Sequence, residues 1–294
     1  MRTEVHAMPV RQALNRVRGM PFRWSLNPYR GCRHACAYCY ARATHRFLDL
    51  SPDEDFSTVL FAKTNIADVL RQEVGRAGWD RDRVALGTAT DPYQPLEGRY
   101  KLTRSCLFVL WEARTPVDIV TKGTLIVRDL DVLAQMARSG LVRVWFSVPT
   151  VDREIWRRSE PGTPAPTHRL RALARLREAG VPGGVFLAPI LPGITDDPTH
   201  LRQAVQAAKE AGALAVGGQL LRLASDVKPV YRRFLERWYP HLTAAYDRWY
   251  ADGADAPPAL SRRLRTTLDR LRAEWGLARD LDGELPASQL TFGW

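Results

Sequence analysis

Short apolar runs rich in β-branched and aromatic residues alternate, over the first three quarters of the chain, with stretches whose apolar residues recur three and four positions apart. The short runs predict six strands, at residues 22–26, 83–87, 116–121, 142–148, 184–190 and 213–221. The stretches between them predict helices, three of which end at a glycine: Gly140, Gly180 and Gly212. Strands that alternate with helices in this way form a parallel sheet covered by helices.

The strand-helix units follow one another without a change of spacing, which favours one curved sheet over two separate domains. We therefore predict an α/β fold, a partial (β/α)6 TIM-like barrel, over residues 22–224, preceded by a basic N-terminal segment, residues 1–21. From residue 225 to residue 294 the pattern is helical and rich in aromatic residues, so we expect a helical C-terminal extension packed on the barrel. Its tryptophans are expected to be core or interface residues: Trp238, Trp249 and Trp275.

Composition and charge narrow the class of protein. The chain has 294 residues, 45% of them hydrophobic, which is enough to fill a sizeable core. It lacks a long apolar run and an apolar N-terminal signal, so we expect a cytoplasmic protein with no membrane partner. The formal net charge is +11, and residues 1–50 hold nine arginines against two acidic residues. This excess indicates an anionic partner such as DNA, RNA or a nucleotide, unless the general preference for arginine over lysine reflects codon composition alone.

Three of the four cysteines, Cys32, Cys36 and Cys39, lie in the stretch "GCRHACAYCYAR" directly after the first predicted strand. In parallel α/β barrels, sites are built at the C-terminal ends of the strands. A cubane iron-sulfur cluster takes cysteine thiolates as ligands, and three from the protein leave one iron open for a substrate or cofactor. Two alternatives stay open here: a zinc site completed by His34 or His45, and three unrelated buried thiols.

The spacing Cys-x3-Cys-x-aromatic-Cys, in the loop after the first strand of such a barrel, resembles the radical S-adenosylmethionine superfamily. Within it the chain is similar to the spore photoproduct lyase-like branch over about residues 25–197, on the stretches "SLNPYRGC", "CYAR", "TDPYQPLEGRYKLTR", "TKGTLIVRDLDVL", "FSVPTVDREIWRRSEPGTPAP" and "APILPGITD". The resemblance implies a [4Fe-4S] cluster on Cys32, Cys36 and Cys39 whose fourth iron chelates S-adenosylmethionine. It also implies an external electron donor such as flavodoxin or ferredoxin, and reductive cleavage of the cofactor to a 5′-deoxyadenosyl radical that abstracts a substrate hydrogen atom.

The resemblance assigns contacts to S-adenosylmethionine as well. Tyr38, directly before the last cysteine, is expected near the adenine. Thr90 and Asp91 follow the second predicted strand, where the superfamily places polar groups for the methionine amino group, and a hydroxyl or an anion suits an ammonium. The alternative for Asp91 is that it caps the turn before Pro92.

Further cofactor contacts are implied at the ends of later strands. Lys122, at the end of "DIVTK", is expected to pair with the methionine carboxylate or a ribose hydroxyl. Ser147, at the end of the fourth strand, and Glu160, in "SEPG", stand where the branch holds the ribose. Gly217 and Gly218 either let the backbone approach the adenine or bend the last strand. Each of the polar residues also fits a solvated loop position or a helix cap.

One departure from the branch concerns the return of hydrogen. The lyase itself uses a cysteine after its second strand to return a hydrogen atom to the product radical, but the matching stretch here, residues 87–91, reads "GTATD" and has no thiol. Cys106 falls one helix later, in an apolar pattern, and is expected to be a core thiol. Two tyrosines are candidates to relay an electron or a hydrogen atom, or simply to pack: Tyr93 and Tyr40.

Two hypotheses of different classes follow. The first is a radical S-adenosylmethionine enzyme that abstracts hydrogen from a substrate, with nucleic acid or a nucleotide suggested by the basic N-terminal third. The second is a non-catalytic iron-sulfur or zinc protein that binds nucleic acid and uses the metal as a structural or redox-sensing element. Cleavage of S-adenosylmethionine distinguishes them.

Overall fold

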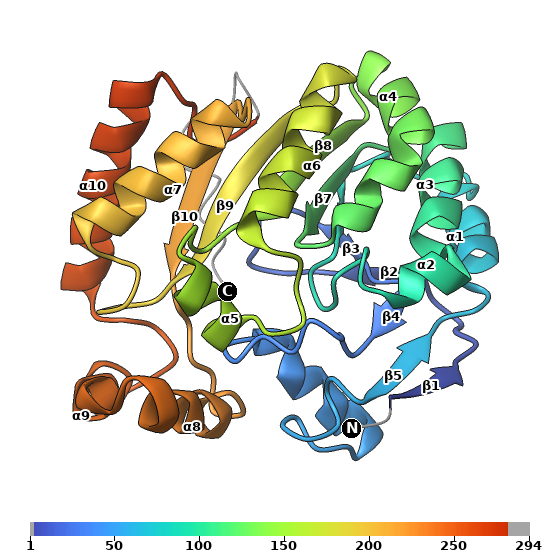
Figure 1. Ribbon diagram of the computed structural model, residues 1–294. Helices are drawn as coiled ribbons and strands as arrows, with labels where there is room; N and C mark the ends of the chain where they lie inside the picture. Colours follow the sequence, from blue (N-terminus) through green and yellow to red (C-terminus); the bar gives the residue numbers. More distant parts are fainter. Residues whose placement is uncertain (1–2, 282–294) are drawn as a thin grey trace.

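The computed structural model describes residues 3–281 (Figure 1), so residues 282–294 of the expected extension and residues 1–2 lie outside the described part of the chain. All six predicted strands form and lie side by side in one sheet, in the order β10-β9-β8-β7-β6-β3. Every neighbouring pair among them is parallel. The six strands are β3 (Trp24–Leu26), β6 (Val84–Leu86), β7 (Val117–Thr121), β8 (Val142–Ser147), β9 (Gly183–Ile190) and β10 (Ala215–Leu220).

The sheet is open. A seventh strand, β2 (Leu14–Arg16), pairs antiparallel with β3 and forms one edge, and β10 forms the other. No pairing joins these two edges among the residues described, so the strands form a partial barrel. The predicted α/β fold with a mostly parallel sheet is therefore confirmed.

Helices cover the outer face of the sheet (Figure 1) because each turns an apolar stripe toward it. In α4, for example, the buried side chains are Val132, Leu133 and Met136. The expected glycine stops are confirmed, since Gly140, Gly180 and Gly212 each follow the C-cap residue of their helix and all have positive φ. The covering helices between the strands are α1 (Ile66–Val74), α3 (Leu102–Glu112), α4 (Leu130–Arg138), α6 (Pro166–Glu178) and α7 (Pro198–Glu210).

The N-terminal segment contributes strands to two sheets. Besides β2, it forms β1 (Glu4–Ala7), which pairs with β5 (Val59–Ala62) in a small sheet that β4 (Tyr29–Arg30) completes. This small sheet lies next to the cysteine loop (Figure 1). The remaining short elements are the 3₁₀ helices η1 (Tyr40–Leu48) and η2 (Thr124–Asp129) and the helices α2 (Leu96–Tyr100) and α5 (Arg153–Ser159).

The C-terminal helices divide into two groups. α10 (Pro258–Trp275) packs on α7 and β10, with its leucines in the main core, and so covers the sixth parallel strand as the other helices cover theirs. α8 (Lys228–Trp238) and α9 (Thr243–Trp249), joined by η3 (Pro240–Leu242), share a second core cluster with the cysteine loop. Among residues 3–281, no helix is long and apolar enough to span a bilayer.

The three tryptophans of the extension differ in burial. Trp249 and Trp275 are partly buried against the two core clusters. Trp238 is 38% exposed, and its ring lies under the guanidinium groups of Arg158, from α5, and Arg237. Trp238 is therefore no core residue, although it joins α8 to α5 through cation–π contacts.

Candidate functional site: a cysteine-lined cavity at the open barrel

The loop that carries the three cysteines is fixed by hydrogen bonds to its backbone. The Cys32 amide donates to the Phe56 carbonyl at 3.0 Å. The Gly31 carbonyl accepts from the Thr90 hydroxyl at 2.7 Å and from the Gln94 side-chain amide at 3.0 Å. Thr90, expected at the methionine amino group, thus uses its hydroxyl proton to hold the start of the loop.

All three thiols line one cavity of about 1250 Å³. Cys32 and Cys36 are buried and Cys39 is half-buried. Burial raises the pKa of all three thiols, that of Cys36 to about 12. At Cys32 the charges of Asp91 and of the other two cysteines raise the pKa further.

This donor set fits a [4Fe-4S] cluster better than a zinc ion. In residues 3–281 no three His, Cys, Asp or Glu side chains are already gathered so that they could hold a metal ion. Each of the two candidate fourth ligands of zinc uses one ring nitrogen within the protein: His34 Nδ1 lies 3.3 Å from the Asp91 carboxylate, and His45 Nε2 lies 3.0 Å from the Val59 carbonyl, while His45 Nδ1 is buried without a partner among the residues described. Three thiols on one short loop that faces one cavity are the ligand set of a cubane with an open iron, and one rotatable bond sets each sulfur position.

Arg42, for which the sequence analysis predicts no role, holds the cysteine loop in place. Its guanidinium is buried and donates to the carbonyls of Ala35, Cys36, Pro52 and Asp53 at distances of 3.1–3.4 Å. The same positive charge opposes the effect of burial on the pKa of the neighbouring thiol, that of Cys39. A planar fork with five donors is needed for this set of contacts. Arg42 is the last residue of the stretch "CYAR", but only the folded structure shows which carbonyls its guanidinium reaches.

The buried carboxylate of Asp91 links the segment after β6 to the C-terminal end of β7. One carboxylate oxygen accepts from the Thr121 hydroxyl at 2.6 Å and the Tyr93 amide at 2.9 Å, and the other accepts from the Lys122 amide at 2.6 Å. Burial alone would raise the pKa of Asp91, but the charge of His34 and these hydrogen bonds lower it to about 2. The carboxylate is therefore ionised, as a partner of an ammonium must be, while its contact with the Tyr93 amide is the turn cap considered as the alternative.

Four of the residues expected at the cofactor form one connected network. Lys122 Nζ donates to the Ser147 hydroxyl at 2.7 Å and lies 3.7 Å from the Glu160 carboxylate. The Tyr38 hydroxyl donates to the same carboxylate, and Lys122 Nζ lies 5.7 Å from the centre of the Tyr38 ring. The Ser147 hydroxyl donates in turn to the Ala188 carbonyl of β9 at 2.9 Å. The fold thus brings together groups from the cysteine loop, β7, β8, β9 and the "SEPG" turn.

Arg169 holds this network in place through hydrogen bonds. Its side chain is fully buried in α6, and it donates to Glu160 and Thr163 and to the carbonyls of Ser147 and Pro164. Burial would raise the pKa of Glu160, but the charges of Arg169 and Lys122 lower it, so the carboxylate stays ionised. Arg169 is a positioning residue, because it holds Glu160 and Ser147 and is absent from the cavity lining. Glu160, expected at the ribose, is also absent from the lining and lies buried behind Tyr38 and Lys122.

Gly162, in the "SEPG" turn, allows that turn to touch the cysteine loop. Its amide donates to the His34 carbonyl at 3.1 Å, and a Cβ here would lie 2.2 Å from the Arg33 carbonyl oxygen. Replacing Gly162 by alanine is therefore expected to push the turn and the loop apart, lower the melting temperature by several degrees and reduce the iron bound on reconstitution. Gly98→Ala in α2, where a Cβ meets nothing closer than 3.8 Å, is the matched control and is expected to do neither. Equal iron content and melting temperature in the two variants would contradict this role.

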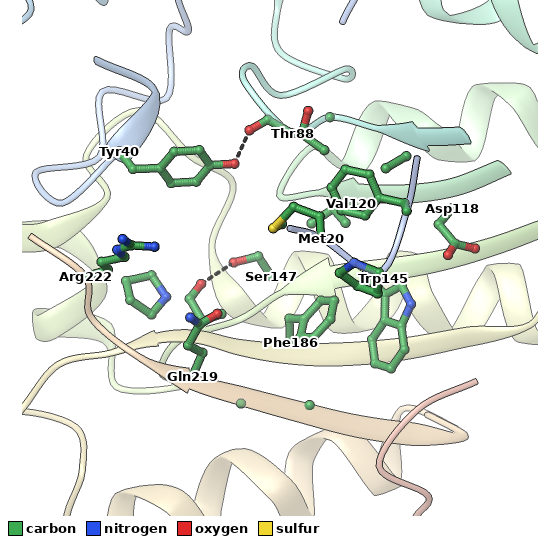
Figure 2. A pocket seen from close by; sticks show the side chains of 18 of the residues that line it. Met20, Tyr40, Thr88, Asp118, Val120, Trp145, Ser147, Phe186, Gln219 and Arg222 are labelled. Carbon is green, nitrogen blue, oxygen red and sulfur yellow. Dashed lines mark hydrogen bonds between the residues drawn. The ribbon is translucent and has the colours of Figure 1, made fainter. Parts of the chain in front are cut away.

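The two candidate relay tyrosines lie in different places. Tyr40 lines the cavity, and its hydroxyl donates to the carbonyl of Thr88, the second residue of the stretch that lacks a thiol (Figure 2). Tyr93 is buried in the main core, outside the cavity lining, and its hydroxyl donates to Asp129 at 3.1 Å. Tyr93 thus has the surroundings of a packing residue, the second alternative for it. Cys106 is fully buried in α3, as expected.

The interior of the barrel below the thiols is aromatic. Trp145 of β8 and Phe186 of β9 stack with ring centroids 4.3 Å apart, and both line the cavity (Figure 2). A Cβ on Gly217 would lie 2.5 Å from the Phe186 ring, so the glycine makes room for this stack. Gly218 is equally constrained, because a Cβ there would lie 2.5 Å from Leu268 of α10.

The cavity is also strongly basic. Its lining within the described residues includes ten Lys or Arg side chains and four Asp side chains. Asp118 binds two of the arginines, Arg143 at 2.6 and 2.7 Å and Arg83 at 3.1 Å, so this group remains net positive. The other basic lining residues are Arg16, Arg18, Arg23, Lys122, Arg222, Arg265, Arg272 and Arg279.

A parallel α/β partial barrel with three clustered thiols at the C-terminal ends of its strands defines a class of iron-sulfur protein, and comparisons with known proteins identify it. Residues 26–205 match the Radical SAM superfamily, and the chain belongs to it. An uncharacterised protein of Mycobacterium tuberculosis is 42% identical over 278 residues, which cover 94% of this chain and 82% of that protein.

More distant relatives carry more specific names. The radical SAM Nalpha-GlyT isomerase of Pseudomonas phage M6 is 22% identical over 255 residues, which are 84% of this chain and 50% of the isomerase. Spore photoproduct lyase in complex with a dinucleoside spore photoproduct superposes with a TM-score of 0.70 at 17% identity and covers 92% of this chain and 79% of the lyase. The resemblance to the superfamily is thus confirmed, and the likeness to the lyase is one of fold. The family implies S-adenosylmethionine and a [4Fe-4S] cluster.

Proposed function

We propose that the protein cleaves S-adenosylmethionine reductively and takes a hydrogen atom from an anionic substrate, a nucleic acid or a nucleotide. The observation that carries this proposal is the single cavity that joins three clustered thiols to a basic, aromatic interior. Cys32, Cys36 and Cys39 would hold the cluster, which would supply the electron for reductive cleavage of a carbon–sulfur bond of the cofactor.

The residues of the chain position the reactants. Tyr38, Lys122 and Ser147 line the cavity and offer donors and acceptors to the hydroxyl and carboxylate groups of the cofactor, and Glu160, outside the lining, holds Tyr38 and Lys122. Thr90 and Asp91 line the same cavity, and the ionised carboxylate of Asp91 is suited to the ammonium group of the cofactor. The Trp145–Phe186 stack limits water in the interior, where a radical needs protection from side reactions. The groups thus hold the reacting atoms in one orientation.

Charge balance supports an anionic substrate. S-adenosylmethionine is itself a net cation at neutral pH, so it adds no negative charge to a lining that has ten basic and four acidic side chains in the described part of the chain. Four of the ten also pair with carboxylates outside the lining, which reduces the excess of positive charge without reversing it: Lys122 with Glu160, Arg222 with Asp255, Arg272 with Asp269 and Arg23 with Asp80. A phosphate-bearing molecule adds negative charge, and a base can stack on the aromatic rings of the interior. The lyase complex with a dinucleoside, on the same fold, is consistent with this choice.

The product radical must regain a hydrogen atom by a route other than that of the lyase. The stretch "GTATD" has no thiol, and Cys106 is buried away from the cavity. Tyr40 is the candidate relay, because its hydroxyl reaches the Thr88 carbonyl at the cavity wall. Since all four cysteines lie within the described residues and the fourth lies in the core, a second cluster is not available to them, and the electron comes from an external donor such as flavodoxin or ferredoxin.

The substrate class is tested with the reconstituted, reduced protein. Single-stranded and duplex DNA, RNA and free nucleotides are expected to bind with an affinity that falls steeply as salt rises, and at least one of them is expected to increase 5′-deoxyadenosine formation. Polyglutamate, an anion without bases, serves as the control that does not increase it. If no nucleic acid or nucleotide binds at low salt, the substrate class is wrong. If DNA or RNA binds but no 5′-deoxyadenosine ever forms, the non-catalytic binding protein replaces the enzyme.

A further inference from the structure

Arg222 has a hydrogen-bond donor that the chain does not satisfy. The residue follows β10 directly after Leu221 and lines the cavity, where Figure 2 draws it with Gln219 and Ser147. Its Nη1 is buried, yet it has no hydrogen-bond partner among the residues described. The carboxyl ends of parallel strands are where this fold class places its ligands.

An exposed carboxylate pairs with the guanidinium of Arg222 on its solvent side. Arg222 Nε lies 3.3 Å from the carboxylate of Asp255, whose side chain is 74% exposed. An ion pair so exposed stabilises the protein little. The backbone on either side is fixed, because the Leu221 amide donates to the Ile190 carbonyl at 2.8 Å and the Leu223 amide to the Ala254 carbonyl at 2.8 Å. One edge of the guanidinium is thus anchored, and its Nη1 is buried at the cavity.

A buried charged donor without an acceptor is costly. Leaving such a group unpaired destabilises the folded protein, and buried polar groups in native proteins nearly always have a partner. Other cations of the cavity already have theirs, since Lys122 bonds to Ser147 and lies near Glu160, and Arg143 bonds to Asp118. Arg222 differs from these cations in that its buried Nη1 has no acceptor among the residues described, although the side chain as a whole is 32% exposed.

We propose that Arg222 binds the anionic group of a molecule held in the cavity, a carboxylate or a phosphate. The planar guanidinium matches the paired oxygens of both groups, and hydrogen bonds to charged acceptors are the strong ones. This choice of ligands rests on the proposed function, under which two molecules carry such a group. S-adenosylmethionine has its methionine carboxylate, and the substrate has a phosphate.

The test measures binding by calorimetry on the reconstituted protein, with three probes: S-adenosylmethionine, 5′-deoxyadenosine, which has no anionic group, and a short single-stranded DNA. Arg222→Gln is expected to weaken one of the two anionic probes by about tenfold or more, the loss of one charged hydrogen-bond pair, and to leave 5′-deoxyadenosine unchanged. Loss confined to S-adenosylmethionine identifies the carboxylate, and loss confined to DNA identifies the phosphate. Arg222→Lys is expected to recover only part of the affinity, because it keeps the charge without the fork.

The control is Arg248→Gln, which removes an exposed charge of α9 that does not line the cavity, and which is expected to leave all three affinities unchanged. Equal visible spectra and denaturation midpoints of the variants establish that the fold and cluster are intact. The proposal is overturned if Arg222→Gln binds both anionic probes as the unchanged protein does, or if the unchanged protein binds neither. A protein that binds a probe through Arg222 but forms no 5′-deoxyadenosine contradicts only the proposed function.

Discussion

Replacing Cys36 by alanine is expected to abolish cluster assembly altogether. Cys36 is buried, lines the cavity and shares one short loop with the two other thiols. A cubane that already relies on three protein ligands has no spare one, because the fourth cysteine lies in the core. After anaerobic reconstitution with iron and sulfide, Cys36→Ala is therefore expected to keep no stoichiometric iron and to lose the visible charge-transfer absorbance.

The matched control is Cys106→Ala, which removes a buried thiol from α3 outside the cavity lining. It is expected to keep the full cluster and to lose only about 1 kcal/mol of unfolding free energy, the effect of a small core cavity. Iron content, sulfide content and absorbance measured on both variants decide the matter. A Cys36→Ala protein that still holds a cluster would show that the eight-residue stretch is not the ligand set.

The second large effect is expected at Arg169. Replacing it by methionine leaves the buried Glu160 without its main counter-charge and removes the donors to the Ser147 and Pro164 carbonyls. Breaking a buried ion pair by removing one partner costs about 3–5 kcal/mol, so urea denaturation of Arg169→Met is expected to show a loss of that size. The double variant with Glu160→Gln is expected to lose less than the sum of the single variants, because no buried charge is then left unpaired.

An exposed pair provides the comparison. Arg232 pairs with Glu236 and Asp247, and all three side chains are about half exposed. Arg232→Met is therefore expected to cost less than about 1 kcal/mol. If Arg169→Met costs no more than Arg232→Met, the network beneath the cofactor residues is not the rigid support that its hydrogen bonds indicate.

The sequence predicted the parts of the fold that depend on local pattern. Each of the six parallel strands lies within or next to a run of apolar residues, because a strand buried on both faces is apolar throughout. The strands that it missed are short and partly exposed, such as β1 with the sequence "EVHA" and the two-residue β4, and their pairing depends on chain segments far away. The break between α8 and α9 coincides with Pro240, a residue that ends a helix before it.

The candidate site was predictable where it depends on the positions of residues along the strands. Lys122 and Ser147 could be placed together because parallel strands carry their C-terminal ends to one edge, and the structure joins them at 2.7 Å. Arg42, Arg169 and Arg222 could not, since the role of each depends on which carbonyl, carboxylate or cavity its long side chain reaches after folding. Tyr93 shows the reverse case, in which nearness to a motif along the chain did not bring the side chain to the cavity.

The most direct test of the whole account is electron paramagnetic resonance of the reconstituted, dithionite-reduced protein, recorded with and without S-adenosylmethionine and followed by assay of the same samples for 5′-deoxyadenosine. The account predicts a cubane signal that the cofactor perturbs, together with 5′-deoxyadenosine, and the loss of both in Cys36→Ala. A protein that holds one zinc ion, gives no cofactor-dependent signal and forms no 5′-deoxyadenosine would contradict it, and the cysteine loop would then be a structural metal site.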